Sequence, residues 1–182
     1  MLSCNKLKKL CKERNISTNE LAGYVARGAF NRDKAATAIK NWCHGLLKPI
    51  PTTEDVDRLA NGLGVEVTSI SQWKSSYRYA PSSARKARLV TDLIAGRDVQ
   101  DALDVLKFEH KRAARMVEQV LASAVANADE GEADVERLYI CEARADGAGR
   151  RLGTKTWIAK DRGKAHPICK EASHIHIIVA EG

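Results

Sequence analysis

The order of patterns from Tyr77 to the C-terminus constrains the fold more than any other feature of the chain. This part opens with Y-R-Y-A-P-S-S-A-R-K-A-R-L-V, continues with apolar residues at helical spacing and a long basic segment, and ends with S-H-I-H-I-I-V. Helices followed by strands are typical of an α+β domain. We therefore expect residues 77–182 to form an α+β domain with three helices, a small antiparallel sheet and a long basic β-hairpin at about 147–170.

The three helices of this domain follow from apolar residues spaced three or four positions apart. They are expected at 83–96, 99–106 and 113–128, with Arg85 and Arg88 opposite the apolar face of the first. Strands are indicated by β-rich or alternating stretches. They are expected at 77–79, as an edge strand, and at 138–145, 154–159, 165–170 and 174–180.

The segment at 147–170 predicts a hairpin that needs a partner surface. It holds seven basic side chains and one acidic one, a local net charge of +6. In Asp161-Arg162-Gly163 the glycine can supply the positive φ that a tight turn requires. Trp157 is suited to stacking on an unpaired base, which is worth about 1–3 kcal/mol in proteins that bind single-stranded nucleic acid. An isolated two-stranded ribbon is marginal in water, so the alternative is a solvated flexible loop.

Three segments in this part resemble the L-twenty-two family of large-subunit ribosomal proteins. Ser82–Val90 resembles the first-helix signature of the family, Ser123–Ala128 the end of its third helix, and Ser173–Ile175 the start of its last strand. The resemblance implies a structural constituent of the large ribosomal subunit that binds large-subunit rRNA and supports subunit assembly. It also implies a hairpin beside the peptide exit tunnel, contacts with neighbouring ribosomal proteins, and a location on cytoplasmic ribosomes.

The same resemblance implies which residues contact rRNA. They are Arg78, Arg85, Lys86, Arg88, Lys111, Arg112, Arg150, Arg151, Lys155, Trp157, Lys160, Arg162, Lys164, Lys170 and His174. The implied hairpin tip is Lys160, Asp161, Arg162, Gly163 and Lys164. The glycine and the flanking basic residues match the family, whereas its proline is missing and Asp161 is an addition.

No pattern in the chain predicts catalysis. Spacing defines no Ser/His/Asp or Cys/His set, and Gly153-Thr154-Lys155 lacks the Gly-Lys-Ser/Thr of a phosphate-binding loop. We therefore predict no enzyme activity, no catalytic residue and no cofactor. His174 and His176 project to the same side of the last strand and could bind a metal ion, but the family match favours structural or RNA-contacting roles. No metal site is predicted.

Residues 1–73 predict a separate all-α module of five short helices. Leu7, Leu10 and Cys11 share one helical face, and Ser17-Thr18-Asn19-Glu20 has the form of a capping box. Further helices are expected at about 34–43, after Pro51-Thr52-Thr53, and toward Ile70.

The same module resembles the Xre/Cro-type helix-turn-helix family. The resemblance rests on Glu20-Leu21-Ala22, Ile39-x-Asn41-Trp42-x-x-Gly45 and Leu59-Ala60-x-x-Leu63-Gly64-Val65. It implies DNA as a partner and a DNA-binding transcription regulator as the alternative function. The residues implied to contact nucleic acid are Lys34, Thr37, Lys40 and Asn41. The chain departs from the family by extra residues around Arg27-Gly28-Ala29-Phe30-Asn31, so docking on protein or RNA stays open.

A boundary between the two parts is expected in the polar stretch Ser71–Ser76, where apolar periodicity is absent. This predicts a module at 1–73, a linker at 74–76 and a ribosomal-protein-like domain at 77–182.

Composition agrees with a polyanionic partner. The net charge is +7, with 30 Lys and Arg against 23 Asp and Glu. No apolar run is long enough for a membrane span, and the first residues lack a secretory pattern, so a cytoplasmic protein without membrane association is expected. The five cysteines form no C-x-x-C pair, which indicates reduced thiols. Cys4, Cys11, Cys43 and His44 leave a zinc site as the less favoured alternative.

Overall fold

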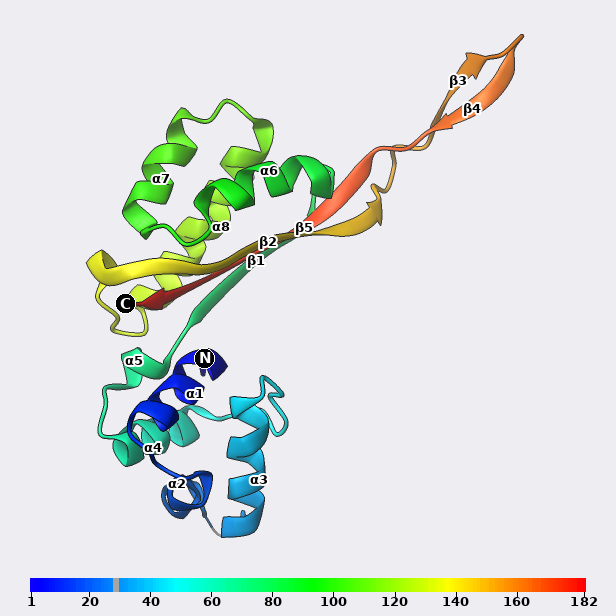
Figure 1. Ribbon diagram of the computed structural model, residues 1–182. Helices are drawn as coiled ribbons and strands as arrows, with labels where there is room; N and C mark the ends of the chain where they lie inside the picture. Colours follow the sequence, from blue (N-terminus) through cyan, green and yellow to red (C-terminus); the bar gives the residue numbers. More distant parts are fainter. Residues whose placement is uncertain (28–29) are drawn as a thin grey trace. The chain divides into compact units, whose positions relative to one another are not determined.

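A computed structural model describes residues 1–27 and 30–182 of the chain (Figure 1). The described residues divide into two compact units. The first contains Met1–Gln72 with Ala180–Gly182, and the second contains Trp73–Val179.

The first unit has five helices among its described residues. They are α1 (Cys4–Glu13), α2 (Thr18–Val25), α3 (Arg32–Cys43), α4 (Thr53–Leu63) and α5 (Val67–Ile70). The predicted capping box at Ser17 is present, and Thr52 forms a second one with Asp55 at the start of α4. These caps satisfy N–H groups that a helix start leaves free. Trp42 is fully buried in the core of this unit, and its Nε1 donates to the carbonyl oxygen of Pro49 at 2.6 Å.

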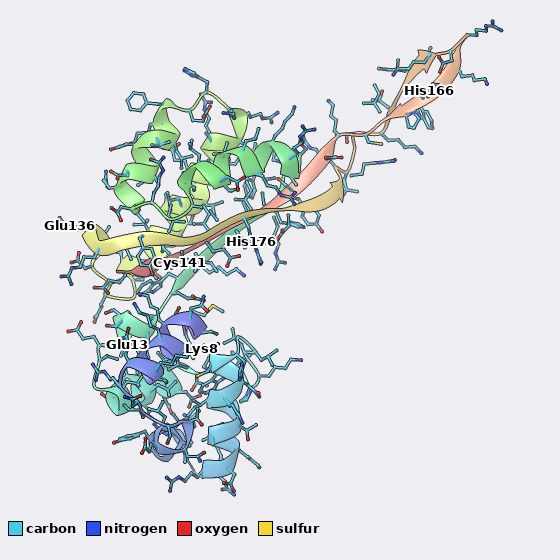
Figure 2. The ribbon with its side chains drawn as sticks, viewed as in Figure 1. Lys8, Glu13, Glu136, Cys141, His166 and His176 are labelled. Carbon is cyan, nitrogen blue, oxygen red and sulfur yellow. The ribbon has the colours of Figure 1, made fainter. Side chains whose placement is uncertain are left out.

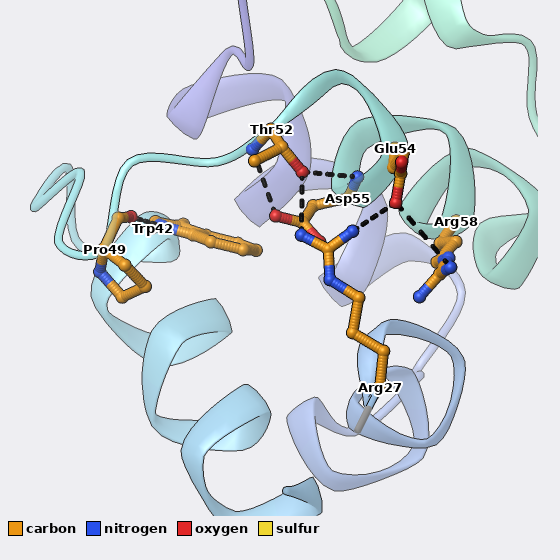
Figure 3. Close-up of polar contacts among 7 residues, drawn as sticks. All are labelled: Arg27, Trp42, Pro49, Thr52, Glu54, Asp55 and Arg58. Atoms are coloured by element: carbon orange, nitrogen blue, oxygen red, sulfur yellow. Dashed lines mark hydrogen bonds and ion pairs between the residues drawn. The ribbon is translucent and has the colours of Figure 1, made fainter. Parts of the chain in front are cut away.

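Arg27, shortly after α2, contacts the start of α4 (Figure 3). Arg27 forms an ion pair with Glu54, and its Nη2 lies 3.3 Å from the buried carboxylate of Asp55. The same nitrogen donates to Thr52 Oγ1 at 3.1 Å. The extra residues expected here include Gly28 and Ala29, which lie outside the described residues. Arg27 and Phe30 on either side form an isolated antiparallel bridge. The helix-turn-helix assignment itself stays a prediction.

The second unit is the predicted α+β domain. Its helices are α6 (Ala84–Ile94), α7 (Val99–Phe108) and α8 (Arg112–Asp129), followed by the short 3-10 helix η1 (Val135–Arg137). Its strands are β1 (Trp73–Ala80), β2 (Leu138–Arg150), β3 (Thr156–Lys160), β4 (Lys164–Ile168) and β5 (Glu171–Glu181).

The strands form two antiparallel arrangements within the described part of the chain. One sheet has the order β1-β5-β2, and β3 pairs with β4 as a separate ribbon that extends beyond it (Figure 1). Helices α6, α7 and α8 lie on one face of the sheet (Figure 1). Ile175, Ile177 and Val179 of β5 are fully buried, whereas the alternating His174 and His176 are half-buried on the opposite face. This alternation places the core between the sheet and the helices.

The predicted linker at 74–76 is wrong, because these residues lie within β1. Trp73 pairs with Val179 and Ser75 with Ile177 along the neighbouring strand. Polar side chains are tolerated here because one face of β1 is exposed, while Trp73 is only 9% exposed and belongs to the core of the second unit. The chain therefore passes from the first compact unit to the second between Gln72 and Trp73.

Candidate nucleic-acid interface

A groove of about 710 Å³ gathers basic side chains from three distant parts of the second unit. It lies where α6 and α8 begin and where the two arms of the hairpin leave the sheet. Its exposed basic side chains are Lys86, Lys111, Arg112, Arg151 and Lys170. Among the described lining residues, Glu171 is the single acidic one. We call the groove that these five residues line the basic groove. All five were predicted as contact residues from the sequence. The sequence did not predict that they would line one groove.

The starts of two helices face this groove. The N-cap residues are Ser83 for α6 and Lys111 for α8, and in the described structure neither side chain forms a capping hydrogen bond. The first turns of both helices, as described, contain no acidic residue. Because the start of a helix carries partial positive charge and N–H donors, these ends add to the attraction of the groove for anions.

The backbone holds the hairpin base in place beside these helix starts. The N–H of Arg151 donates to the carbonyl oxygen of Lys170 at 2.8 Å, so two residues of the basic groove are tied across the two arms. On the other side, Lys111 Nζ lies 3.0 Å from Glu109, and this contact lowers the pKa of the Glu109 carboxyl. The Glu109 carboxylate therefore offsets part of the positive charge of Lys111.

The hairpin beyond the groove presents its charges to solvent. Lys160 pairs with Lys164, and the predicted turn at Asp161, Arg162 and Gly163 is present, with φ values of 47°, 60° and 87°. His166 lies on β4 (Figure 2). Its Nε2 is 3.1 Å from a carboxylate oxygen of Asp161. The basic side chains exposed along this segment are Arg150, Lys155, Lys160, Arg162 and Lys164.

Trp157 is placed as a stacking surface on this hairpin. Its side chain is 55% exposed, and Lys155 Nζ lies 5.6 Å from the ring centroid. A large apolar ring left in water at this level is available to a partner, and the neighbouring ammonium adds positive charge beside it. The geometry suits one base stacked next to a phosphate.

Two predicted contact residues also have partners within the fold. Arg88 Nε donates to the carbonyl oxygen of Ala145 on β2 at 3.0 Å, although the side chain was expected to face away from the domain. His174 Nδ1 accepts a hydrogen bond from the backbone N–H of Tyr79 at 3.1 Å. The centroids of the His174 and Tyr79 rings lie 4.7 Å apart. Arg78 and Arg85 are exposed, as an RNA-contacting role requires.

Sequence reasoning missed Tyr79. Its φ is 57°, in the left-handed region that residues other than glycine seldom adopt, and its side chain is 67% exposed. The register of β1 against β5 is interrupted between Tyr77 and Ala80, which is how the chain turns Tyr79 outward. The available signal was an aromatic residue beside Arg78, two positions before Pro81.

In the first unit, three of the four predicted contact residues of α3 are accessible. Lys34, Thr37 and Lys40 are exposed on one face of the helix. Asn41 is half-buried, and its Nδ2 donates to the carbonyl oxygen of Lys48 at 3.0 Å. Its amide therefore fixes the segment after α3.

The zinc alternative finds no support in the described residues, where no group of three or more His, Cys, Asp or Glu side chains is arranged to hold a metal ion. Among the described helices, none is both long and apolar enough to cross a bilayer.

The sequence of the chain can be compared with those of known proteins. Residues 75–180 match the family described as Ribosomal protein L22p/L17e. "Large ribosomal subunit protein uL22" of Caldicellulosiruptor saccharolyticus is 43% identical over 115 residues, which cover 63% of this chain and 92% of the relative. The protein of the same name from Aquifex pyrophilus is 47% identical over 104 residues, covering 57% and 76% of the two chains. That from Geobacter sulfurreducens is 41% identical over 104 residues, covering 57% and 91%. The chain therefore belongs to the ribosomal protein L22p/L17e family.

Proposed function

We propose that the chain is a structural constituent of the large ribosomal subunit and binds large-subunit rRNA through the basic groove and the hairpin. The proposal rests mainly on one observation: five basic side chains line one groove. The starts of α6 and α8, which have no side-chain cap, lie in the same groove. Such a surface neutralises several phosphates at once and releases their counterions. Family membership supports the same partner.

The hairpin also supports this function, because a ribbon of two strands needs a partner surface to stay ordered. As an isolated ribbon with exposed side chains it gains little from its own packing. RNA supplies both phosphates for its basic residues and unpaired bases for Trp157. We infer that this contact supports subunit assembly, that the tip from Lys160 to Lys164 lies beside the peptide exit tunnel of cytoplasmic ribosomes, and that neighbouring ribosomal proteins pack around it.

The experiment compares the full chain with an Arg112→Ala/Arg151→Ala variant in binding to a large-subunit rRNA fragment over a range of salt concentrations. Removing one phosphate contact should lower the slope of log affinity against log salt by roughly one. The matched control is Arg137→Ala, which removes an exposed arginine of η1 that pairs with Asp134 at 3.7 Å. Circular dichroism checks that the variants fold. An unchanged slope in the double variant would falsify the groove as a phosphate site.

A second candidate function is DNA-binding regulation by residues 1–73, favoured by the exposed row of Lys34, Thr37 and Lys40 on α3. The test is a Lys34→Ala/Lys40→Ala variant of the full chain, measured against one duplex sequence and against bulk DNA. Strong preference for one sequence, abolished in the variant, would support a regulator. Because extra residues separate α2 from α3, we expect weak, salt-sensitive binding without sequence preference.

A further inference from the structure

Tyr79 and His174 form an aromatic pair on the face of the sheet that the helices leave uncovered. The backbone N–H of Tyr79 donates to His174 Nδ1 at 3.1 Å, and the two rings meet edge to face, with 73° between their planes. Ile175, the next residue on β5, is fully buried, so His174 projects away from the core. The pair therefore lies outside the packed interior of the second unit.

The backbone of Tyr79 is held in a conformation that is costly for a residue with a Cβ. Its φ is 57°, and the register of β1 against β5 is interrupted between Tyr77 and Ala80. Such conformations cluster at binding and active sites. The side chain of Tyr79 is nevertheless 67% exposed, so the fold gains little from burying its ring. Packing alone does not explain a tyrosine here, because glycine would adopt this backbone without strain.

The aromatic pair is close in the chain to the basic groove. Pro81, two residues after Tyr79, and Glu171, three residues before His174, both line that groove. Arg78, beside Tyr79, is exposed. An exposed aromatic ring next to cations suits a nucleotide, because the base stacks on the ring while its phosphate meets the positive charge.

We propose that Tyr79 is the stacking surface for one unpaired base of the bound RNA, and that His174 is the residue that positions its ring. This inference rests on the function proposed above. A base inside a duplex has both faces covered by its neighbours, so only an unstacked base can lie on Tyr79. The stacking site therefore distinguishes single-stranded RNA from duplex RNA, whereas the cations of the basic groove attract both.

The test compares the full chain with Tyr79→Gly in binding to two probes, a single-stranded RNA oligonucleotide and a perfect RNA duplex with the same number of phosphates. Glycine accepts a φ of 57° without strain, so the variant should fold as judged by circular dichroism and urea denaturation. We expect a roughly 10-fold loss of affinity for the single strand and little change for the duplex. The salt slope should stay unchanged, because no charge is removed.

Further substitutions separate stacking from a purely structural role. Tyr79→Trp keeps an aromatic face and should retain affinity for the single strand, whereas Tyr79→Leu should lose it as glycine does. His174→Ala removes the acceptor of the Tyr79 N–H and should weaken binding of the single strand. In a Tyr79→Gly background the same change should have little further effect, because a positioning residue acts through the ring it positions.

Tyr24→Ala is the matched control, since this tyrosine is 57% exposed on α2 of the first unit. It should bind both probes as the unmodified chain does. Unchanged single-strand affinity in Tyr79→Gly, or an equal loss for the duplex, would overturn the stacking site. The Arg112→Ala/Arg151→Ala variant tests the proposed function separately. A lowered salt slope in that variant together with normal binding by Tyr79→Gly would reject the stacking site alone.

Discussion

The guanidinium of Arg88 holds helix α6 against strand β2, because its Nε donates to the carbonyl oxygen of Ala145 at 3.0 Å. Ala145 is buried, so this carbonyl has little access to water. Arg85, one turn earlier on the same helix, is exposed. Both arginines are therefore exposed, but only Arg88 also has a hydrogen bond that supports the fold.

Replacing these two arginines separately should give different results. Arg88→Ala leaves a carbonyl without its charged donor and should lower the free energy of unfolding by about 1–3 kcal/mol. Arg85→Ala should change it by about 0.5 kcal/mol or less, yet weaken rRNA binding. Urea denaturation and binding titrations measure the two effects. Equal stability of both variants would show that the Arg88 contact contributes nothing to the fold.

The hairpin tip should contribute to binding in proportion to the number of phosphates it neutralises. In an Arg162→Ala/Lys164→Ala variant, the salt slope of rRNA binding should fall by roughly one for each phosphate that the tip no longer neutralises. Both side chains are exposed, so the stability of the second unit should not change. Lys107→Ala is a control, since its ammonium pairs with Asp104 on the exposed side of α7 at 3.0 Å. A slope equal to that of the unmodified chain would exclude phosphate binding at the tip.

Local patterns explain which parts of the fold could be predicted. Helices α6, α7 and α8 were expected because apolar spacing and helix-ending residues are properties of neighbouring positions. Part of strand β1 was expected to be a linker because Lys74, Ser75 and Ser76 are polar. Its strand character depends on pairing with β5 about a hundred residues later, and no local signal carries that information.

The candidate site shows the same difference between what local sequence predicts and what depends on tertiary packing. The residue types of the basic groove followed from charge and family resemblance, whereas the groove itself depends on how α6, α8 and the hairpin base pack. The partners of Arg88, Asn41 and His174 are backbone groups, whose position a sequence does not reveal. Residue identity predicted the chemistry, and tertiary packing decided which side chains remain free.

The position of β1 determines where the chain can be divided. A chain of residues 73–182 should fold and bind rRNA with an unchanged salt slope, because its core lies within this unit. A chain of residues 76–182 lacks Trp73 and should be less stable by about 3 kcal/mol or more. Urea denaturation and rRNA titration compare the two. Failure of the longer fragment to bind would show that the first unit is needed for the interface.

Gly131 provides a sharp test of the packing around Trp73. A Cβ added at this glycine would lie 2.5 Å from Trp73 Nε1, so the indole would have to move. Gly131→Ala should therefore cost about 1–3 kcal/mol of stability. The matched control is Gly147→Ala on β2, where an added Cβ meets no described atom within 4 Å. Thermal and urea unfolding of both variants should separate them, and equal stabilities would contradict the described position of the indole.

His176 should make the stability of the second unit depend on pH. Burial is the largest cause that lowers the pKa of its imidazole from 6.5, and Lys74 and Arg144 act in the same direction. Its Nδ1 is buried and has no hydrogen-bond partner in the described structure, so a proton added there would be left unsatisfied.

Below about pH 6.5 the unfolded chain therefore takes up a proton that the folded unit resists, and stability falls as the pH drops through this range. His176→Gln should weaken this decrease, measured by urea unfolding at several pH values between 7.5 and 5. The carboxylate of Asp146, 3.9 Å from His176 Nε2, raises the imidazole pKa. Asp146→Asn should consequently steepen the decrease, and a pH dependence that both variants leave unchanged would remove His176 as its source.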